Sequence, residues 1–171
     1  MTVMLEKSDR VPHGYQMTTE LLVGEPREQV FEFFADAFQL ETITPPWLHF
    51  SVQTPRPIEM HAGTIIDYRL RLHGLPIRWQ SKISNWDPPS HFVDEQTKGP
   101  YHYWHHLHTF EEADGGTLVR DTVHYALMLG FILHPLLVRR DLTKIFEFRR
   151  ETMSRIFTTM SSSTSVQETV S

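Results

Sequence analysis

The segment His102–Phe110, HYWHHLHTF, contains four histidines in nine residues. In a strand, side chains alternate between the two faces, so Trp104, His106, His108 and Phe110 share one face. Trp104 and Phe110 are large apolar side chains that we expect to be buried. The pattern therefore predicts that His106 and His108 also face the interior.

Two histidines separated by one residue on a strand are spaced well for binding a metal ion. A metal site needs a third ligand, which Asp94 or Asp121 could supply. No complete metal-ligand signature occurs in the chain. The pattern therefore favours two hydrogen-bonded histidines in a polar pocket or core, and we predict neither a metal nor a cofactor.

Asp94 and Asp121 are also expected to face inward. Asp94 shares a strand face with Phe92, and Asp121 shares one with Val119 and Val123. A buried aspartate near a histidine can form an acid/base pair. The same residues can instead form a charge network that stabilises the core, and this reading is somewhat favoured. A register shift of one residue would turn both carboxylates outward.

Arg149 lies in the middle of an apolar helical stripe, between Ile145 and Met153. A buried guanidinium must be paired, because an isolated buried charge costs several kcal/mol. Three readings remain open. Arg149 could pair with Asp121 or Asp94, it could lay its stem on apolar surface with its head in water, or it could bind the carboxylate or phenolate of a ligand.

Alternation of apolar and polar residues predicts a series of strands that position these side chains. In residues 64–72, for example, Ile66, Tyr68 and Leu70 alternate with charged residues. Strands are predicted at residues 17–23, 49–54, 64–72, 77–83, 92–98, 102–112 and 117–128. The turns between the later strands contain Gly74 and Pro76, Asp87-Pro88-Pro89 and Asp114-Gly115-Gly116. One polar face per strand is typical of an antiparallel sheet.

Helical spacing occurs in two regions. The first follows Pro26 and ends at Thr44-Pro45-Pro46. The second, about Pro135–Met160, carries one long stripe that comprises Leu142, Ile145, Phe146, Met153, Ile156, Phe157 and Met160. A curved antiparallel sheet would supply the apolar surface that this stripe needs. We predict an α+β fold of about seven strands around a long C-terminal helix, with two short helices after the first strand.

The chain is expected to form one domain. Residues 1–13 are predicted to be a flexible arm, residues 14–160 the folded domain and residues 161–171 a disordered tail. No internal repeat or linker divides the central region. The apolar segment Leu127–Leu137, just before the long helix, is expected to form part of the mouth of any cavity.

Composition excludes several classes of function. The 171 residues include no cysteine, so disulfides and thiolate chemistry are absent and a cytoplasmic location is favoured. A formal net charge of −5 argues against nucleic acid as the main partner. No apolar run is long enough for a transmembrane helix, and no Gly-rich phosphate loop or serine-hydrolase motif occurs.

The order of elements, together with five segments, resembles the SRPBCC superfamily, the START-like helix-grip proteins that include polyketide cyclases and plant pollen allergens. Within this superfamily the similarity is to the polyketide cyclase/dehydrase set. The segments are PREQVFEFFADAFQLETITPPWL, GTIIDYRLRLHGLPIRWQSKI, FVDEQTKGPYHYWHHLHTFEE, GGTLVRDTVHYAL and RRDLTKIFEFRRE, which lie within roughly residues 17 to 157. The resemblance implies a helix-grip fold, but a fold hosts many functions and no shared catalytic motif transfers to this chain.

In this fold the core and the pocket wall are the same surface, so inward residues become candidates for ligand binding. They are Tyr68, Trp79, Gln96, Trp104, His106, His108, Tyr125, Phe146 and Arg149. We predict binding of a small hydrophobic or aromatic molecule, such as a lipid or a polyketide, in a cavity between sheet and helix. A homodimer is left open.

The alternative function is that of an enzyme, a cyclase or dehydratase acting on a polyketide-like substrate. In such an enzyme His106 or His108 would be the base. Asp94 or Asp121 would orient that base, and Arg149 would stabilise an oxyanion.

Overall fold

The computed structural model describes residues 3–127 and 137–168, with side chains up to residue 158. Eight strands form one antiparallel sheet in the order β1-β2-β8-β7-β6-β5-β4-β3. The strands are β1 (Met4–Lys7), β2 (Tyr15–Val23), β3 (Ser51–Val52), β4 (Ile65–Leu72), β5 (Leu75–Asp87), β6 (His91–Lys98), β7 (Tyr103–Ala113) and β8 (Gly116–Ala126).

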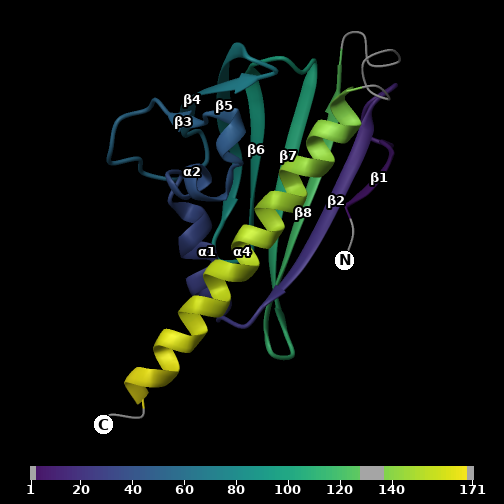
Figure 1. The fold of residues 1–171 in the computed structure, drawn as a ribbon. Helices are drawn as coiled ribbons and strands as arrows, with labels where there is room; N and C mark the ends of the chain where they lie inside the picture. The colour runs from purple at the N-terminus through teal and green to yellow at the C-terminus, as the bar shows by residue number, and fades with distance from the viewer. Residues whose placement is uncertain (1–2, 128–136, 169–171) are drawn as a thin grey trace.

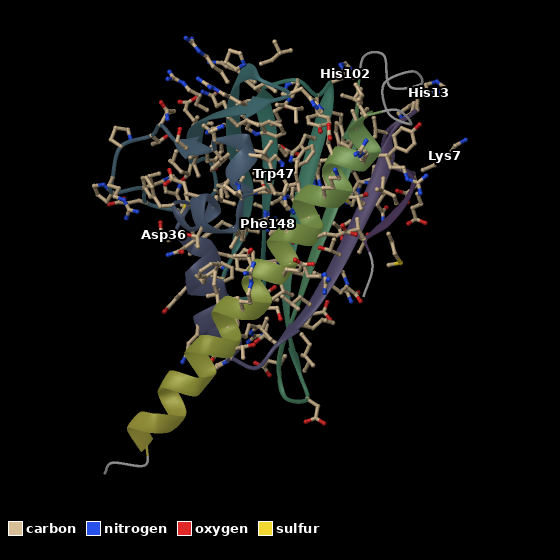
Figure 2. All side chains as sticks on the ribbon, viewed as in Figure 1. Lys7, His13, Asp36, Trp47, His102 and Phe148 are labelled. Carbon is tan, nitrogen blue, oxygen red and sulfur yellow. The ribbon has the colours of Figure 1, made fainter. Side chains whose placement is uncertain are left out.

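The helices lie on one face of this sheet (Figure 1). The long helix α4 (Arg139–Glu168) runs diagonally across that face, and α1 (Arg27–Ala35) and α2 (Gln39–Ile43) lie beside it at the β3–β5 side. A single 3₁₀ turn, η1 (Pro46–Leu48), follows α2. Trp47 of η1 and Phe148 of α4 lie close together, with ring centroids 5.5 Å apart, so this turn packs against the helix (Figure 2).

The polar/apolar alternation of the sequence decides which face of each strand is covered by helices. In β4, Ile66 and Tyr68 are buried, whereas Asp67 and Arg69 are exposed. The hairpin between β4 and β5 turns through Gly74, whose φ of +79° is a conformation that favours glycine. The predicted α+β helix-grip architecture is confirmed.

The stripe on α4 packs onto the inner face of the sheet. Its buried side chains divide between two apolar clusters: Leu142 and Phe146 join Trp104 and Tyr125 in one, and Met153 joins a second that includes Val119, Phe110 and Phe157. Arg149 lies between these clusters along the helix and is only 8% exposed. The helix therefore buries the charge of Arg149 next to the middle of the sheet.

The structure differs from the sequence-based expectation at its edges. An eighth strand, β1, pairs with β2 inside the segment predicted to be a flexible arm. The strand predicted at residues 49–54 is shortened to Ser51–Val52. Helix α4 continues to Glu168, past the point where a disordered tail was expected. The predicted start of this helix and most of the expected mouth segment lie outside the described residues. Within residues 3–127 and 137–168, no helix has the length and apolar content needed to span a membrane.

Candidate functional site

A cavity of about 200 Å³ lies between the inner face of the sheet and α4. One water needs only about 10–15 Å³ on a comparable scale, so the space is larger than a site for one or two waters. Most of the wall is apolar and comes from β4, β5, α1, α2 and α4. Its members include Ile66, Leu70, Ile77, Leu142 and Ile145. The cavity therefore has the apolar lining typical of a small-molecule site.

Four ionisable side chains meet where β6, β7 and β8 run side by side. The strand register places Asp94 of β6 opposite His106 of β7, and Asp121 of β8 opposite His108 of β7. His106 is 4% exposed, His108 3% and Asp121 2%. We call these four residues the Asp–His cluster. The expectation that both histidines face inward is confirmed.

Each histidine of the cluster contacts both aspartates. Nε2 of His106 lies 3.1 Å from Oδ1 of Asp121, and its Nδ1 lies 3.4 Å from Oδ2 of Asp94. Nε2 of His108 lies 3.0 Å from Oδ2 of Asp94. Nδ1 of His108 lies 2.7 Å from Oδ1 of Asp121, although without hydrogen-bond geometry. The two imidazole rings lie between the carboxylates with their centroids 3.7 Å apart.

Arg149 approaches this cluster from α4. Its Nε lies 3.8 Å from Oδ2 of Asp121, which is an ion pair but too long for a hydrogen bond. Nε and Nη2 are buried and have no hydrogen-bond partner. The guanidinium also lies 5.6 Å from the ring centroid of Phe34 and 5.8 Å from that of Phe146. Arg149 therefore balances the charge of Asp121. Because it also lines the cavity, its unpartnered N–H groups are available to a ligand.

A second layer of polar side chains orients Asp94. Oγ of Ser81 donates a hydrogen bond of 3.4 Å to Oδ1 of Asp94, and Nε1 of Trp79 donates one of 3.0 Å to Oγ of Ser81. Tyr68 also lines the cavity, and burial, followed by the charge of Asp94, raises the pKa of its phenol. Tyr68 is therefore a neutral hydrogen-bonding group at neutral pH.

The protonation states of the cluster follow from burial and from these contacts. Burial lowers the pKa of His106 to about 4, and the neighbouring His108 adds to the shift. Burial also opposes charge on His108, but its contacts with Asp121 and Asp94 outweigh burial and raise its pKa. Burial disfavours both carboxylates. Arg149 and the histidines nevertheless hold the pKa of Asp121 well below its usual range, and the histidines lower that of Asp94.

These directions describe the charges of the cluster at neutral pH. Asp94 and Asp121 are carboxylates, His106 is neutral, Arg149 supplies a positive charge, and His108 takes up a proton more readily than an ordinary histidine. Asp94, His106 and His108 each offer one potential metal ligand, and these atoms lie within 4.8 Å of one another. The same residues can therefore serve as acid/base groups, as hydrogen-bonding partners of a ligand or as metal ligands.

The structure brings most of the sequence-predicted site residues to the cavity wall. Asp94 and the predicted ligand-binding residues Tyr68, Trp79, Trp104, His106, His108, Phe146 and Arg149 all line it. Three predicted residues do not. The amide of Gln96 instead bonds the backbone of Tyr101, Tyr125 is fully buried in an apolar cluster, and Asp121 lies behind the histidines.

Sequence reasoning missed other parts of the wall. Phe34, Leu48 and Tyr101 line the cavity from α1, η1 and the loop before β7. Ser81 lies in the predicted strand 77–83, on the same face as Trp79. A small polar residue among inward apolar side chains indicates a buried hydrogen-bond partner, so this position carries a signal for the site.

Solved structures similar to this chain include proteins from bacteria and plants. Protein Ms6760 from Mycobacterium smegmatis matches with a TM-score of 0.65 and 18% identity, over 92% of this chain and 99% of that protein. Ginseng major latex-like protein 151 from Panax ginseng matches with a TM-score of 0.65 and 10% identity, over 85% of this chain and 99% of that chain. The ZhuI aromatase/cyclase from a Streptomyces species has a TM-score of 0.60 and 16% identity, over 84% of this chain and 96% of that enzyme. At these identities the likeness shows the fold alone.

No curated protein matches the sequence. A family model does match residues 23–147, which is most of the chain, and its description is polyketide cyclase/dehydrase and lipid transport. The match contains α1, α2, strands β3–β8, the Asp–His cluster and the start of α4. This chain belongs to the polyketide cyclase/dehydrase and lipid transport family.

Proposed function

We propose that this chain binds a small, mostly apolar molecule in the cavity, with a polar group of that molecule against the Asp–His cluster and Arg149. The observation that carries the proposal is the arrangement of the wall. Apolar side chains from β4, β5 and α4 enclose the space, whereas its buried charged groups lie together at β6, β7 and the middle of α4. Membership of a family described by cyclase, dehydrase and lipid-transport activities supports this proposal.

Arg149 indicates the chemistry of the polar group. Its buried, unpartnered Nε and Nη2 would be satisfied by a carboxylate, a phenolate or a carbonyl oxygen. Satisfying buried donors is favourable because each unsatisfied group costs about 1–3 kcal/mol. A ligand with an aromatic or aliphatic body and an anionic or carbonyl end therefore fits the wall.

The proposal can be tested with 1-anilinonaphthalene-8-sulfonate, which has an apolar aromatic body and an anionic group. We expect saturable binding of one molecule per chain. Leu70→Trp fills the cavity from β4 and should weaken binding at least tenfold, whereas Arg69→Trp, on the exposed face of the same strand, should leave it unchanged. Equal binding by both variants, with cooperative unfolding preserved, would contradict the proposal.

A second candidate function is acid/base catalysis of the cyclase or dehydratase type. The observation in its favour is that His106 and Asp94 line the cavity while contacting each other. Because its pKa is lowered to about 4, His106 is unprotonated at neutral pH and can accept a proton. Arg149 lies on the same wall and could stabilise an enolate or phenolate oxygen.

The test of this second candidate is turnover of an aromatic polyketide-like substrate by the wild type and by a His106→Ala, His108→Ala double variant. Loss of at least a hundredfold in kcat is expected if the histidines are the acid/base groups. Turnover unchanged in the double variant would rule out this assignment. A wild type that binds the compound without turnover would leave ligand binding as the function.

A further inference from the structure

We propose that Asp94, His106 and His108 bind a divalent transition-metal ion, such as Zn²⁺ or Fe²⁺, with an open coordination position that faces the cavity. This inference goes beyond the binding of an apolar molecule, because the ion would be held by the protein's own side chains. It also departs from the expectation of no metal that the sequence alone favours.

The spacing of the donor atoms fits a shared ion. Oδ2 of Asp94 lies 3.0 Å from Nε2 of His108 and 3.4 Å from Nδ1 of His106. Two ligand atoms that are each about 2.1 Å from one ion lie about 3.0 Å apart at a right angle and about 3.4 Å apart at a tetrahedral angle. The potential ligand atoms of the three residues all lie within 4.8 Å of one another. The two Asp94–histidine separations are therefore those that a shared ion requires.

The number of available hydrogen atoms is compatible with a cation on the Asp94 side. All four ring nitrogens of the two histidines face carboxylate oxygens at 2.7–3.4 Å. Two neutral imidazoles carry only two N–H groups, so an additional proton or a metal ion is needed to satisfy all four contacts. A metal ion beside Asp94 would take the place of the proton between Asp94 and His108.

Asp121 occupies the position of an outer partner rather than a ligand. Its Oδ1 lies 3.1 Å from Nε2 of His106 and 2.7 Å from Nδ1 of His108. Metal-binding histidines usually donate their second N–H to a carboxylate, which orients the ring. Ser81 orients Asp94 in the same way through the hydrogen bond to Oδ1. Asp94 and His106 thus each have a hydrogen-bond partner that orients them, and His108 has Asp121 within ion-pair distance.

The open coordination position of the ion would face the cavity. Asp94, His106 and His108 line the cavity, whereas Asp121 does not. Arg149 lies 3.8 Å from Asp121 and balances its charge, so a divalent ion and Asp94 together leave one positive charge. Two histidines and one carboxylate with open positions are a ligand set found in catalytic zinc and non-haem iron proteins. The ion would face a polar or anionic oxygen of a molecule in the cavity.

The test is titration of the chelator-treated full chain with Co²⁺, whose visible absorption reports its coordination. We expect one equivalent per chain and a melting temperature raised by about 5–10 °C at a hundredfold excess over Kd. Asp94→Asn, His106→Gln and His108→Gln should each weaken binding at least a hundredfold. Asp121→Asn should weaken it about ten- to hundredfold. His105→Gln and His124→Gln, at positions outside the proposed ligand set, should bind as the wild type does.

Absence of stoichiometric binding by the wild type would overturn the proposal, and so would unchanged binding by His106→Gln or His108→Gln. If these variants fail to fold, NMR of the wild type decides. Paramagnetic Co²⁺ should then shift the ring signals of His106 and His108 far more than those of His105, and the opposite pattern contradicts the site. Binding of 1-anilinonaphthalene-8-sulfonate by the chelator-treated protein tests the cavity separately, so failure of the metal site and failure of ligand binding can be told apart.

Discussion

Neighbouring histidines of β7 lie in opposite chemical environments. His106 and His108, at inward positions, lie between two aspartates and are almost fully buried. His105, at the intervening position, lies 3.1 Å from the guanidinium Nη1 of Arg10 in the segment between β1 and β2. Nearby, Nδ1 of His124 in β8 is hydrogen-bonded to Ser8 of the same segment. We call His106 and His108 the inner set and His105 and His124 the outer set. The residue type is the same, but the inner set contacts anions and the outer set lies beside a cation.

This difference shows that the position of a histidine in the strand register determines its charged neighbours, and these neighbours set its protonation state more than the residue type does. Burial and then Arg10 lower the pKa of His105, and burial, Arg10 and His105 lower that of His124. Glu95, opposite His105 in the sheet, and Asp9 near His124 act in the other direction but are outweighed. At the inner positions, strands β6 and β8 each contribute an aspartate, and α4 contributes Arg149. Only the inner set combines acid/base groups with a cavity.

The largest expected effect comes from removing Arg149, the cation that approaches the inner set from α4. Arg149→Leu removes the permanent positive charge beside the buried carboxylate of Asp121, and we expect a loss of about 3–5 kcal/mol in the free energy of unfolding. The matched control is Arg140→Leu, at an exposed position of the same helix, which should change stability by no more than about 0.5 kcal/mol. Urea denaturation measures both. Equal stability of the two variants would show that the Asp–His cluster does not depend on Arg149.

The second-largest effect is expected from replacing an inward histidine of β7, and the matched variant replaces an outward histidine of the same strand. His108→Ala removes a ring that is stacked on Phe92 at 4.2 Å and that contacts both aspartates. We expect a loss of about 2–4 kcal/mol from unpaired carboxylates and lost packing. His105→Ala removes partly exposed contacts with Arg10, Tyr103 and His124 and should cost less than about 1 kcal/mol. Similar losses in chemical denaturation would remove the distinction between the two sets.

The inner set also gives the metal-free protein a characteristic dependence on pH. The pKa of His106 is about 4 in the folded state, against about 6.5 when unfolded. Between these values the unfolded chain binds the extra proton, so stability rises with pH from about 4 to 6.5, by up to about 3 kcal/mol. The raised pKa of His108 acts with the opposite sign above pH 6.5, because the folded state then holds the extra proton.

Urea midpoints measured against pH, with a chelator present, test this dependence. The urea midpoint of His106→Gln should rise less steeply with pH than that of the wild type between pH 4 and 6.5. The midpoint of His105→Gln should keep most of the wild-type slope, because His105 is less buried and contributes less. Identical slopes for the wild type and His106→Gln would mean that His106 is not held neutral by its surroundings.

The smallest effect is expected from the outer set. Arg10→Ala should raise the pKa of His105 and of His124, because Arg10 opposes the protonation of both. Stability should change by less than about 1 kcal/mol, as is usual for exposed charges. NMR titration of the histidine ring signals measures the pKa values. Lys7→Ala, which removes an exposed cation of β1, is the control, and an equal response to both substitutions would exclude a specific effect of Arg10.

Much of the fold could be predicted because two periodicities are strong in this chain. Residues such as Ile66 and Tyr68 alternate cleanly with charges, and Leu142, Phe146, Met153 and Phe157 recur at helical spacing. Strand β1 could not be predicted, since its four residues, MLEK, are mostly exposed and show no buried face. An edge strand paired on one side leaves a weak sequence signal because little of it is buried.

The site could be predicted only in part, because facing inward is not the same as lining the cavity. His106, His108 and Asp94 were placed correctly by alternation. Tyr125 also faces inward, but it packs in the cluster that contains Met17 and Leu142. Gln96 reaches the backbone of Tyr101 instead. Such outcomes depend on how three or more elements meet, which alternation within one strand does not encode.

The most direct test of the central claim, that the cavity holds a small molecule, is native mass spectrometry of the protein purified from its own source. The wild type is expected to carry the mass of one small organic molecule per chain, and Arg69→Trp should carry the same mass. Leu70→Trp, which fills the cavity from β4, should appear at the mass of the bare chain. The contradicting result would be a wild type without any bound molecule, or one whose bound molecule is retained in full by Leu70→Trp.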